Sequence, residues 1–172
     1  MNNDITHEQQ AAQVRALFLD VDGTLTDGRL YVSADTVYRA FHILDGYGLR
    51  RLIAHGILAG LISAAADEGI GKRAQQLGIK HVHTGVPNKL AVVQDILRTE
   101  NIPAQEAAFM GDDLPDLAAM QHVGLAIAPQ TAAAPVLAVA HYIPSLPAGL
   151  GAVREVCDLI LTAQGISPCD IL

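Results

Sequence analysis

Two segments of the chain carry closely spaced carboxylates, and each follows a short apolar run. The segment DVDGT at residues 20–24 follows the run VRALFL, and GDDLPD at residues 111–116 follows AAFM. Several carboxylates that pack together stay ionised only when a cation joins them. Because oxygen ligands without clustered His or Cys suit a hard cation, the two segments predict a Mg²⁺ site.

Two further side chains have the chemistry to bind a phosphate beside that metal. Ser63 ends an apolar run that begins at Ile57, and Lys89 opens a helical pattern. A hydroxyl, an ammonium group and the backbone N–H groups of the following turns together suit a phosphate. Carboxylates, Mg²⁺, a hydroxyl and a lysine around one point predict phosphoryl transfer.

The elements that must position these residues alternate between strands and helices. Apolar runs of strand length lie at 14–21, 57–63, 80–83, 107–111, 124–128 and 141–143. Helical patterns run from Gly46 to Gly56, from Asn88 to Asn101 and from Leu150 to Gln164. A further one follows the run at 57–63, extends through Leu77 and ends at Gly78. The strand-like runs lack period-two alternation, as expected for strands that are buried on both faces. This order predicts the α/β class with a doubly wound, Rossmann-like parallel sheet.

One segment departs from the alternation. Residues 30–43, LYVSADTVYRAFHI, hold two short β-branched and aromatic runs around Ser33-Ala34-Asp35, which predicts a β-hairpin flap. In the organisation that we predict, residues 1–13 form an N-terminal lead-in, residues 14–165 form one domain, and residues 166–172 form a C-terminal tail.

Ligands of an open parallel sheet bind outside the carboxyl ends of its strands. The predicted strands therefore bring one set of side chains to a common edge: Asp20, Asp22, Ser63, Lys89, Asp112, Asp113 and Asp116. Taken singly, each has an ordinary structural explanation, because an aspartate at a strand end often caps the next helix and a lone lysine is usually solvated. Their joint placement at one edge favours the functional interpretation.

The composition excludes several classes of protein. The chain has 172 residues, of which 51% are hydrophobic and 17% charged, and this argues against disorder. The formal net charge of −7 argues against a nucleic-acid-binding surface. The longest apolar stretch, 57–66, is about half of the roughly 20 residues that a membrane helix needs. The polar N-terminus and the unpaired Cys157 and Cys169 lead us to expect a cytoplasmic protein.

The ordered motifs resemble those of the haloacid dehalogenase superfamily of phosphohydrolases over roughly residues 14–165. The matching motifs are DVDGT at 20–24, Ser63 at a strand end, Lys89, and GDDLPD at 111–116. The resemblance implies that Asp20 is the nucleophile that accepts the phosphoryl group. It implies that Asp22 protonates the leaving alcohol and later activates water, and that Asp112 holds Mg²⁺ together with Asp20 and the backbone carbonyl of Asp22.

The same resemblance gives roles to the remaining motif residues. It implies that Thr24, Ser63 and Lys89 bind the phosphate, that Asp113 supports the metal through water, and that Asp116 anchors either Lys89 or the outer shell of the metal. These roles suit the residue types, because an aspartate is a poor nucleophile until Mg²⁺ and a lysine screen the charge of the phosphate.

The gaps between the motifs leave no room for a cap domain. About 40 residues separate Asp22 from Ser63 and about 26 separate Ser63 from Lys89, and the predicted hairpin, helices and strand take them up. A site without a cap stays wet unless another subunit covers it, so we expect an oligomer.

Within the superfamily the chain is similar to the small capless phosphatases of 3-deoxy-D-manno-octulosonate 8-phosphate. The similarity lies in LTDGRLYVS at 25–33, AFHILDGYGLR at 40–50 and GAVREVCDLIL at 151–161. It implies Mg²⁺-dependent hydrolysis of a small phosphorylated sugar acid through an aspartyl-phosphate intermediate. It also implies a homotetramer whose hairpins line neighbouring active sites, and a role in lipopolysaccharide biosynthesis.

Three positions depart from that family's pattern, which has an arginine where this chain has Leu44, Ala65 and Leu150. Arginine recognises a carboxylate by bidentate pairing. We therefore expect weak discrimination between an acid sugar phosphate and its neutral analogue.

Alternatives remain open at this point. Arg39, Lys72, Arg73 or a group of a neighbouring subunit could recognise the carboxylate in place of the missing arginines. The chain could also hydrolyse a different sugar phosphate, or be a catalytically reduced module that serves oligomerisation or binding.

Overall fold

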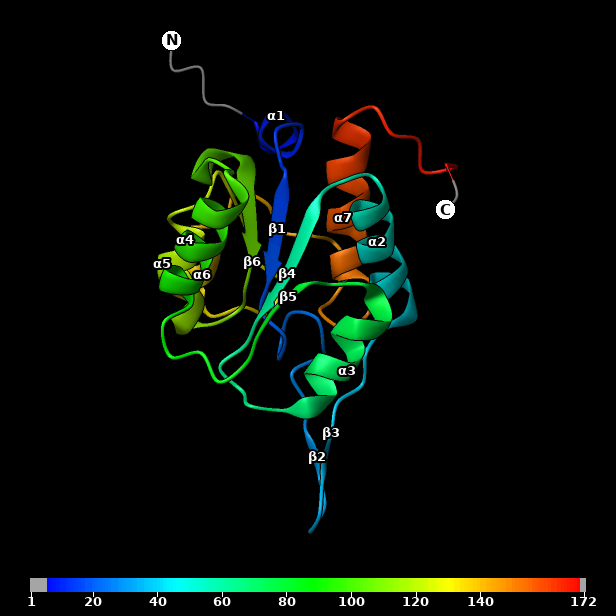
Figure 1. Cartoon of the computed structure of the whole chain (residues 1–172), viewed down its shortest axis with the longest axis vertical. Coiled ribbons are helices and arrows are strands. Elements are labelled where there is room, and N and C mark those ends of the chain that lie inside the picture. Colours follow the sequence, from blue (N-terminus) through cyan, green and yellow to red (C-terminus); the bar gives the residue numbers. More distant parts are fainter. Residues whose placement is uncertain (1–5, 171–172) are drawn as a thin grey trace.

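The computed structural model describes residues 6–170, and at its centre is a parallel sheet of five strands (Figure 1). The strands are Ala16–Leu19 (β1), Leu58–Ile62 (β4), His81–His83 (β5), Ala107–Met110 (β6) and Leu125–Ile127 (β7). They lie in the order β5-β4-β1-β6-β7, and each pair of neighbours is parallel. The predicted α/β class with a doubly wound parallel sheet is confirmed.

Helices cover both faces of this sheet. They are His7–Ala11 (α1), Ile43–Ala54 (α2), Glu68–Leu77 (α3), Lys89–Glu100 (α4), Leu117–Met120 (α5), Ala134–Leu137 (α6) and Ala152–Ala163 (α7). Figure 1 shows α2, α3 and α7 on one face and α4, α5 and α6 on the other.

The side chains of β1 divide between the two faces, because successive side chains of a strand point in opposite directions. Leu17 and Leu19 pack in the core beneath α2 and α7, whereas Ala16 and Phe18 pack in the core beneath α4 and α5. All four are fully buried. Burial on both faces explains the continuous apolar run, and Asp20 is then the first polar side chain after the strand.

The strand predicted at residues 141–143 is wrong. Tyr142 forms a single bridge with Ile127, and the N–H groups of residues 141 and 142 both donate to the carbonyl of Ala126. Pro144 follows and has no N–H to donate, so a ladder cannot continue there.

Helix α2 begins at Ile43, three residues before the predicted start at Gly46. Glycine costs about 1 kcal/mol relative to alanine inside a helix, and here packing overrides that preference. A side chain at Gly46 would overlap the guanidinium group of Arg73 on α3. The glycine therefore permits a close approach of two helices and does not mark a boundary.

Asp45, in the first turn of α2, caps the N-terminus of α7. Its Oδ1 accepts a hydrogen bond from the N–H of Arg154 at 2.8 Å, and its Oδ2 accepts one from Gly151 at 3.3 Å. Gly151 occupies the N-cap position of α7 and has no side chain that could cap the helix itself. The contact fixes α7 against α2. Leu44 and Leu150, which precede Asp45 and Gly151 in the chain, are both exposed.

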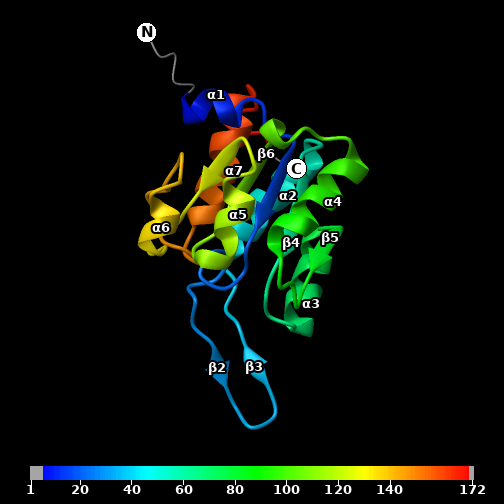
Figure 2. The same cartoon turned by 90° about the vertical axis from the view of Figure 1, so that its left-hand side faces the viewer.

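The predicted hairpin is present as a separate antiparallel pair, β2 (Tyr31–Val32) and β3 (Val37–Tyr38). Figure 2 shows it projecting beyond the carboxyl ends of the sheet strands. Between β1 and α4, the described chain holds this hairpin and the elements of the domain itself. The expected absence of a cap domain is therefore confirmed.

The predicted lead-in at residues 1–13 contains α1, whose Ala11 is fully buried. Residues 1–5 of the lead-in and residues 171–172 of the predicted tail lie outside the described residues. Within residues 6–170, no helix combines the length and apolar character that crossing a bilayer requires.

Candidate active site

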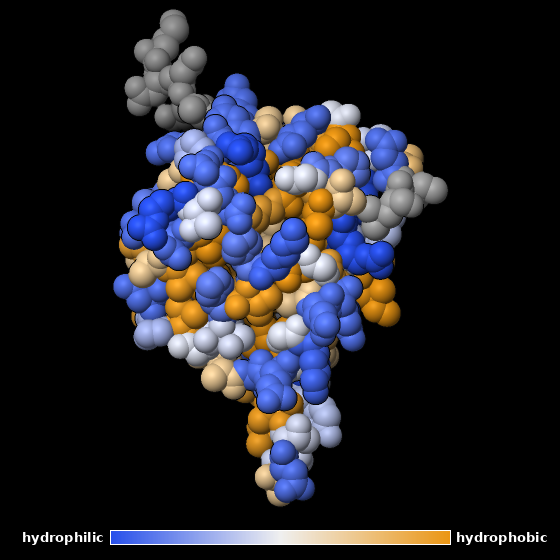
Figure 3. All heavy atoms as spheres, viewed as in Figure 1, coloured by the Kyte–Doolittle hydropathy of each residue, from blue (hydrophilic) through white to orange (hydrophobic). Residues whose placement is uncertain are grey.

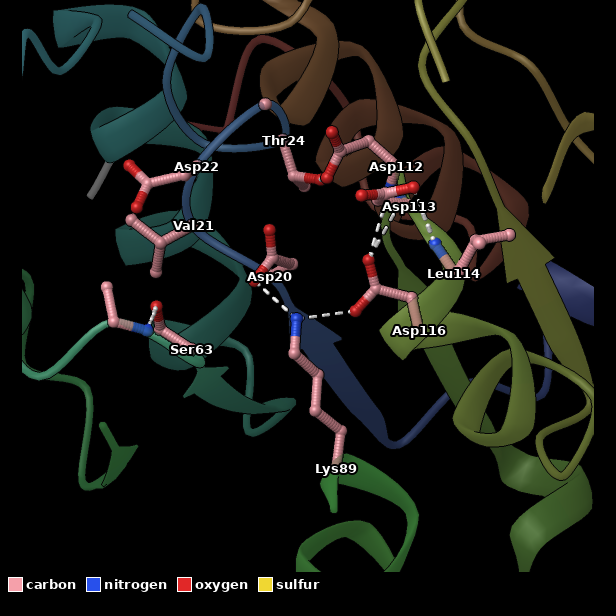
Figure 4. A network of polar contacts seen from close by, with 12 residues as sticks. Asp20, Val21, Asp22, Thr24, Ser63, Lys89, Asp112, Asp113, Leu114 and Asp116 are labelled. Carbon is pink, nitrogen blue, oxygen red and sulfur yellow. Dashed lines mark hydrogen bonds and ion pairs between the residues drawn. The ribbon is translucent and has the colours of Figure 1, made fainter. Parts of the chain in front are cut away.

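A cleft of about 180 Å³ opens at the carboxyl ends of β1, β4 and β6. Seven of the eight predicted site residues line it: Asp20, Asp22, Ser63, Lys89, Asp112, Asp113 and Asp116. These side chains come from four separate parts of the chain, residues 20–22, 63, 89 and 112–116, and Figure 4 shows them converging. The prediction that they meet at one edge of the sheet is confirmed by their positions, and their chemical roles stay predictions.

Lys89 lies at the centre of the polar network (Figure 4). Its Nζ donates to Asp20 Oδ1 at 2.5 Å and to Asp116 Oδ1 at 2.6 Å, and all three side chains are buried. Burial alone would lower the pKa of Lys89, but the two carboxylates outweigh it and raise that pKa above its ordinary value. The ammonium group therefore stays charged in the cleft.

The carboxylates outnumber the cations in this network. Burial raises the pKa of Asp20, and Lys89 only partly opposes this. Burial, with the nearby Asp20 and Asp116, raises the pKa of Asp112 from 3.8 to about 7. Burial is the larger cause of both shifts, and the carboxylates that the single ammonium group leaves unbalanced add to it.

The excess negative charge fits a divalent cation. Asp20, Asp112 and Asp116 each offer an oxygen, and these oxygens lie within 4.8 Å of one another. A set made of oxygen ligands alone suits Mg²⁺. Because both oxygens of Asp116 already accept hydrogen bonds, from Lys89 and from the N–H groups of Asp112 and Asp113, we expect Asp20 and Asp112 to be the carboxylates that bind the ion.

Asp116 holds the loop after β6 in place. Its Oδ2 accepts from the backbone N–H of Asp112 at 3.0 Å and of Asp113 at 3.2 Å, while its Oδ1 accepts from Lys89. Asp113 itself caps the 3₁₀ turn Leu114–Asp116 by accepting from the N–H of Leu114. Asp116 thus positions Asp112. Asp113 caps the turn, and its predicted role in supporting the metal through water stays a prediction.

Asp22 is held by a residue that sequence reasoning did not connect with it. Nε and Nη2 of Arg39 donate to the two carboxylate oxygens at 2.7 and 2.9 Å. Nη1 of Arg39 lies 2.8 Å from Oδ2 of Asp67, as an ion pair without hydrogen-bond geometry. The Asp22 carboxylate consequently points away from Asp20 and Lys89 (Figure 4). No spacing in the sequence signals this contact, because it depends on the path of the hairpin.

The two predicted hydroxyl ligands occupy different environments. Ser63 lines the cleft, and its Oγ accepts from the N–H of Ala65 at 3.1 Å. Thr24, the eighth predicted residue, is fully buried, and its Oγ1 lies 3.5 Å from Asp112 Oδ1. Gly23 has φ +88°, and a side chain there would overlap the Asp112 carboxylate. The tight turn therefore brings the segment after β1 directly against Asp112.

Comparison with known proteins links this geometry to a family. The model of the haloacid dehalogenase-like hydrolases matches residues 62–148. Over 157 residues the chain is 41% identical to the 3-deoxy-D-manno-octulosonate 8-phosphate phosphatase KdsC of Yersinia pestis, which covers 91% of this chain and 84% of that protein.

Two crystal structures are similar along nearly the whole chain. That of the Yersinia pestis phosphatase has a TM-score of 0.91 and 40% identity, and covers 95% of this chain and 88% of that one. That of the Moraxella catarrhalis phosphatase, a complex with a magnesium ion, a phosphate ion and a KDO molecule, has a TM-score of 0.90 and 36% identity. It covers 92% of each chain.

The raised pKa of Asp112 predicts how stability without a metal depends on pH. Between 3.8 and about 7 the folded chain keeps a proton on Asp112 that the unfolded chain has lost. The free energy of unfolding in EDTA should therefore fall as the pH rises through this window. Urea unfolding at a series of pH values measures it.

The variant Asp112→Asn provides the control, because it cannot ionise and its slope should be shallower. Mg²⁺ should raise the free energy of unfolding of the wild type most at the upper end of the window, where the ion no longer competes with a proton. Equal slopes for the two proteins would contradict the assignment.

Proposed function

We propose that this chain, which belongs to the haloacid dehalogenase-like hydrolases, releases phosphate from 3-deoxy-D-manno-octulosonate 8-phosphate. It is a phosphomonoesterase, and Mg²⁺ is its cofactor. The observation that carries the proposal is the buried Lys89 between Asp20 and Asp116, at the carboxyl ends of β1 and β6.

Asp20 is the nucleophile in this proposal. One carboxylate oxygen attacks phosphorus, the bond from phosphorus to the sugar oxygen breaks, and an aspartyl-phosphate forms. Water then attacks the phosphorus and releases inorganic phosphate. Lys89 orients Asp20 through its 2.5 Å hydrogen bond and offers positive charge to the phosphoryl oxygens.

Asp22 is the acid and base. It lies two residues after Asp20 and lines the same cleft, which gives its carboxyl group access to the leaving oxygen. In the structure its carboxylate is paired with Arg39, so the proton-transfer step includes the release of this ion pair.

The donor set fits Mg²⁺, as the surplus of carboxylates over ammonium groups shows. Asp20, Asp112 and the backbone carbonyl of Asp22 are the proposed ligands. When it is bound there, Mg²⁺ screens the negative charge of the phosphate against the attacking carboxylate. Ser63 and Thr24 complete the proposed phosphate site, with Thr24 acting from its buried position beside Asp112.

The first test of the proposal is phosphate release from 3-deoxy-D-manno-octulosonate 8-phosphate. The purified protein should release phosphate with Mg²⁺ and should lose this activity in EDTA. Ca²⁺ should inhibit, because it takes more oxygen ligands at longer distances and can draw both oxygens of Asp20 onto the metal. Full activity in excess EDTA, or no release from this substrate, would contradict the proposal.

The second test replaces the nucleophile. Asp20→Asn should lower kcat by about 10³-fold or more, because the amide cannot attack phosphorus. Circular dichroism should show that the variant is folded. Asp95→Asn makes the same chemical change on the exposed face of α4 and should keep normal activity. A near-normal rate with Asp20→Asn would remove Asp20 as the nucleophile.

We also propose that the chain forms a homotetramer in which hairpins cover neighbouring clefts. The hairpin exposes Tyr31, Val32 and Tyr38, of which Val32 is 73% exposed. Figure 3 shows hydrophobic residues on the projecting hairpin. A two-stranded hairpin with apolar side chains in water is marginal by itself, and apolar surface of this kind commonly marks an interface.

The oligomer is tested by light scattering after size-exclusion chromatography. The molar mass measured for the wild type should be four times that of the chain. Val32→Lys should lower the measured molar mass. Gln121→Lys adds the same charge away from the hairpin and should leave the mass unchanged. A wild-type monomer, or a tetramer insensitive to Val32→Lys, would refute this arrangement.

The proposed compartment is the cytoplasm, and the proposed role is lipopolysaccharide biosynthesis. Cys157 is buried and Cys169 is exposed, and both are free, which suits a reducing compartment. Cell fractionation checks the compartment, and accumulation of the phosphorylated sugar acid in a deletion strain checks the role.

A further inference from the structure

Arg39 joins three separate segments of the chain beside the cleft. It follows β3 directly, and its side chain is 6% exposed. Two of its nitrogens, Nε and Nη2, donate to the two carboxylate oxygens of Asp22, in the turn after β1. The third, Nη1, lies 2.8 Å from Oδ2 of Asp67, the N-cap residue of α3. One guanidinium group thus holds two carboxylates that come from different elements.

This pairing decides where the carboxylate of Asp22 points. Both of its oxygens accept from Arg39, and it is turned away from Asp20 and Lys89 (Figure 4). A general acid or base acts within about 2.6–3.2 Å of the group with which it exchanges a proton. Asp22 must therefore leave Arg39 before it can reach a leaving oxygen beside Asp20. The structure shows the proposed acid and base in a withdrawn position.

The withdrawn position limits the negative charge inside the cleft. The carboxylates of Asp20, Asp112 and Asp116 already lie close together there. The phosphate of a substrate is an anion, and a further ionised carboxylate turned towards it would repel it. Pairing with Arg39 keeps Asp22 next to the cleft while a positive charge balances its own.

Asp67 makes the release of Asp22 possible. A buried guanidinium group without any carboxylate partner is strongly unfavourable. Nη1 of Arg39 and Oδ2 of Asp67 already form an ion pair, and Nη1 makes no hydrogen bond among the described residues. Nη1 is therefore free to donate to Asp67 once Asp22 has left. Arg39 has a partner in both positions of Asp22, which is what a two-state switch requires.

The other cations near Arg39 lack this connection. Lys72 and Arg73 line the same cavity as Arg39, a space of about 260 Å³ between β3 and α3. Within residues 6–170, neither forms an ion pair with a carboxylate. Of these three cations, Arg39 is the one that can act on Asp22 through direct contact.

We propose that Arg39 is a positioning residue that holds the Asp22 carboxylate out of the cleft until the phosphate of the substrate has bound, and that Asp67 keeps Arg39 paired when Asp22 turns in. The inference rests on the proposed function, because it concerns the residue assigned there as acid and base. The leaving oxygen of a bound substrate gives Asp22 a hydrogen-bond partner that the empty cleft lacks, and this difference favours the turned-in position. Arg39 itself does not contact the phosphate.

The experiment measures the affinity for inorganic phosphate by calorimetry with excess Mg²⁺, so that inactive variants can be compared with active ones. Arg39→Met should weaken phosphate binding about tenfold, because Asp22 is then free to enter the cleft and repel the anion. In an Asp22→Asn background, which lacks that charge, adding Arg39→Met should change the affinity by about twofold at most. An equal loss in both backgrounds would overturn the proposal, since Arg39 would then act on phosphate without Asp22.

Two further variants separate the contact with Asp22 from charge and from folding. Lys72→Met removes a cation from the same cavity, and any change in phosphate affinity should be the same in both backgrounds. Arg39→Lys keeps the positive charge and should lose less affinity than Arg39→Met, again only where Asp22 is present. Circular dichroism and a thermal unfolding midpoint should show that each variant is folded, and Arg39→Lys carries the test if Arg39→Met does not fold.

Asp67→Asn tests the exchange of partners. An asparagine can still cap α3 by accepting from the N–H of Gly69, as Oδ1 of Asp67 does. It leaves Arg39 without a second carboxylate, so the turned-in position of Asp22 becomes less favourable. For 3-deoxy-D-manno-octulosonate 8-phosphate, kcat should fall about tenfold while KM stays nearly unchanged. An unchanged kcat would overturn the role of Asp67.

The outcomes distinguish this inference from the proposed function. A wild type that hydrolyses the sugar acid phosphate, without coupling between residues 22 and 39 in phosphate affinity, overturns the switch and leaves the proposed function in place. A wild type that does not hydrolyse this substrate overturns the proposed function. In that case the affinities for inorganic phosphate still decide whether Arg39 positions Asp22.

Discussion

One buried ammonium group, that of Lys89, joins segments that lie far apart in the chain. It bonds Asp20 at the end of β1 and Asp116 after β6, from the first residue of α4. Buried carboxylates without a partner would cost several kcal/mol each, so the three segments must come together around this charge. A single ammonium group nevertheless leaves the carboxylates in surplus, and this surplus adds to the effect of burial in raising the pKa of Asp112. The stability of the cleft and its affinity for a cation thus have one electrostatic origin.

Much of the fold and of the site could be predicted because both depend on strand ends. The runs that became β1, β4 and β6 are buried on both faces, and their continuous apolar character makes them visible in the sequence. Once those strands are parallel, Asp20, Ser63 and Asp112 must share an edge. The contact of Lys89 with Asp116 was expected from the resemblance and is present at 2.6 Å.

The features that could not be predicted depend on tertiary contacts without a local pattern. Arg39 meets Asp22 because the hairpin leads the chain back to the cleft, and sequence periodicity carries no information on that path. The burial of Thr24 follows from the turn at Gly23, and the start of α2 follows from packing against Arg73. The missing strand at residues 141–143 depends on Pro144, which prediction from the apolar run alone did not weigh. The substitutions at Leu44, Ala65 and Leu150 show which guanidinium groups are lost, but only the structure shows where Lys72 and Arg73 lie.

The cap that Asp45 provides for α7 has a consequence for how the chain folds. Its two bonds span 106 and 109 residues, and the ion pair of Arg51 with Asp158 spans 107. Closing loops of that length lowers the conformational entropy of the chain before the contacts at the loop ends can stabilise the fold. During synthesis α2 leaves the ribosome long before α7. Until α7 has been made, the carboxylate of Asp45 lacks the N–H groups of Gly151 and Arg154 as hydrogen-bond donors. The domain can therefore reach its final packing only when its last helix has been made, because a chain that ends before Gly151 lacks both backbone donors of Asp45.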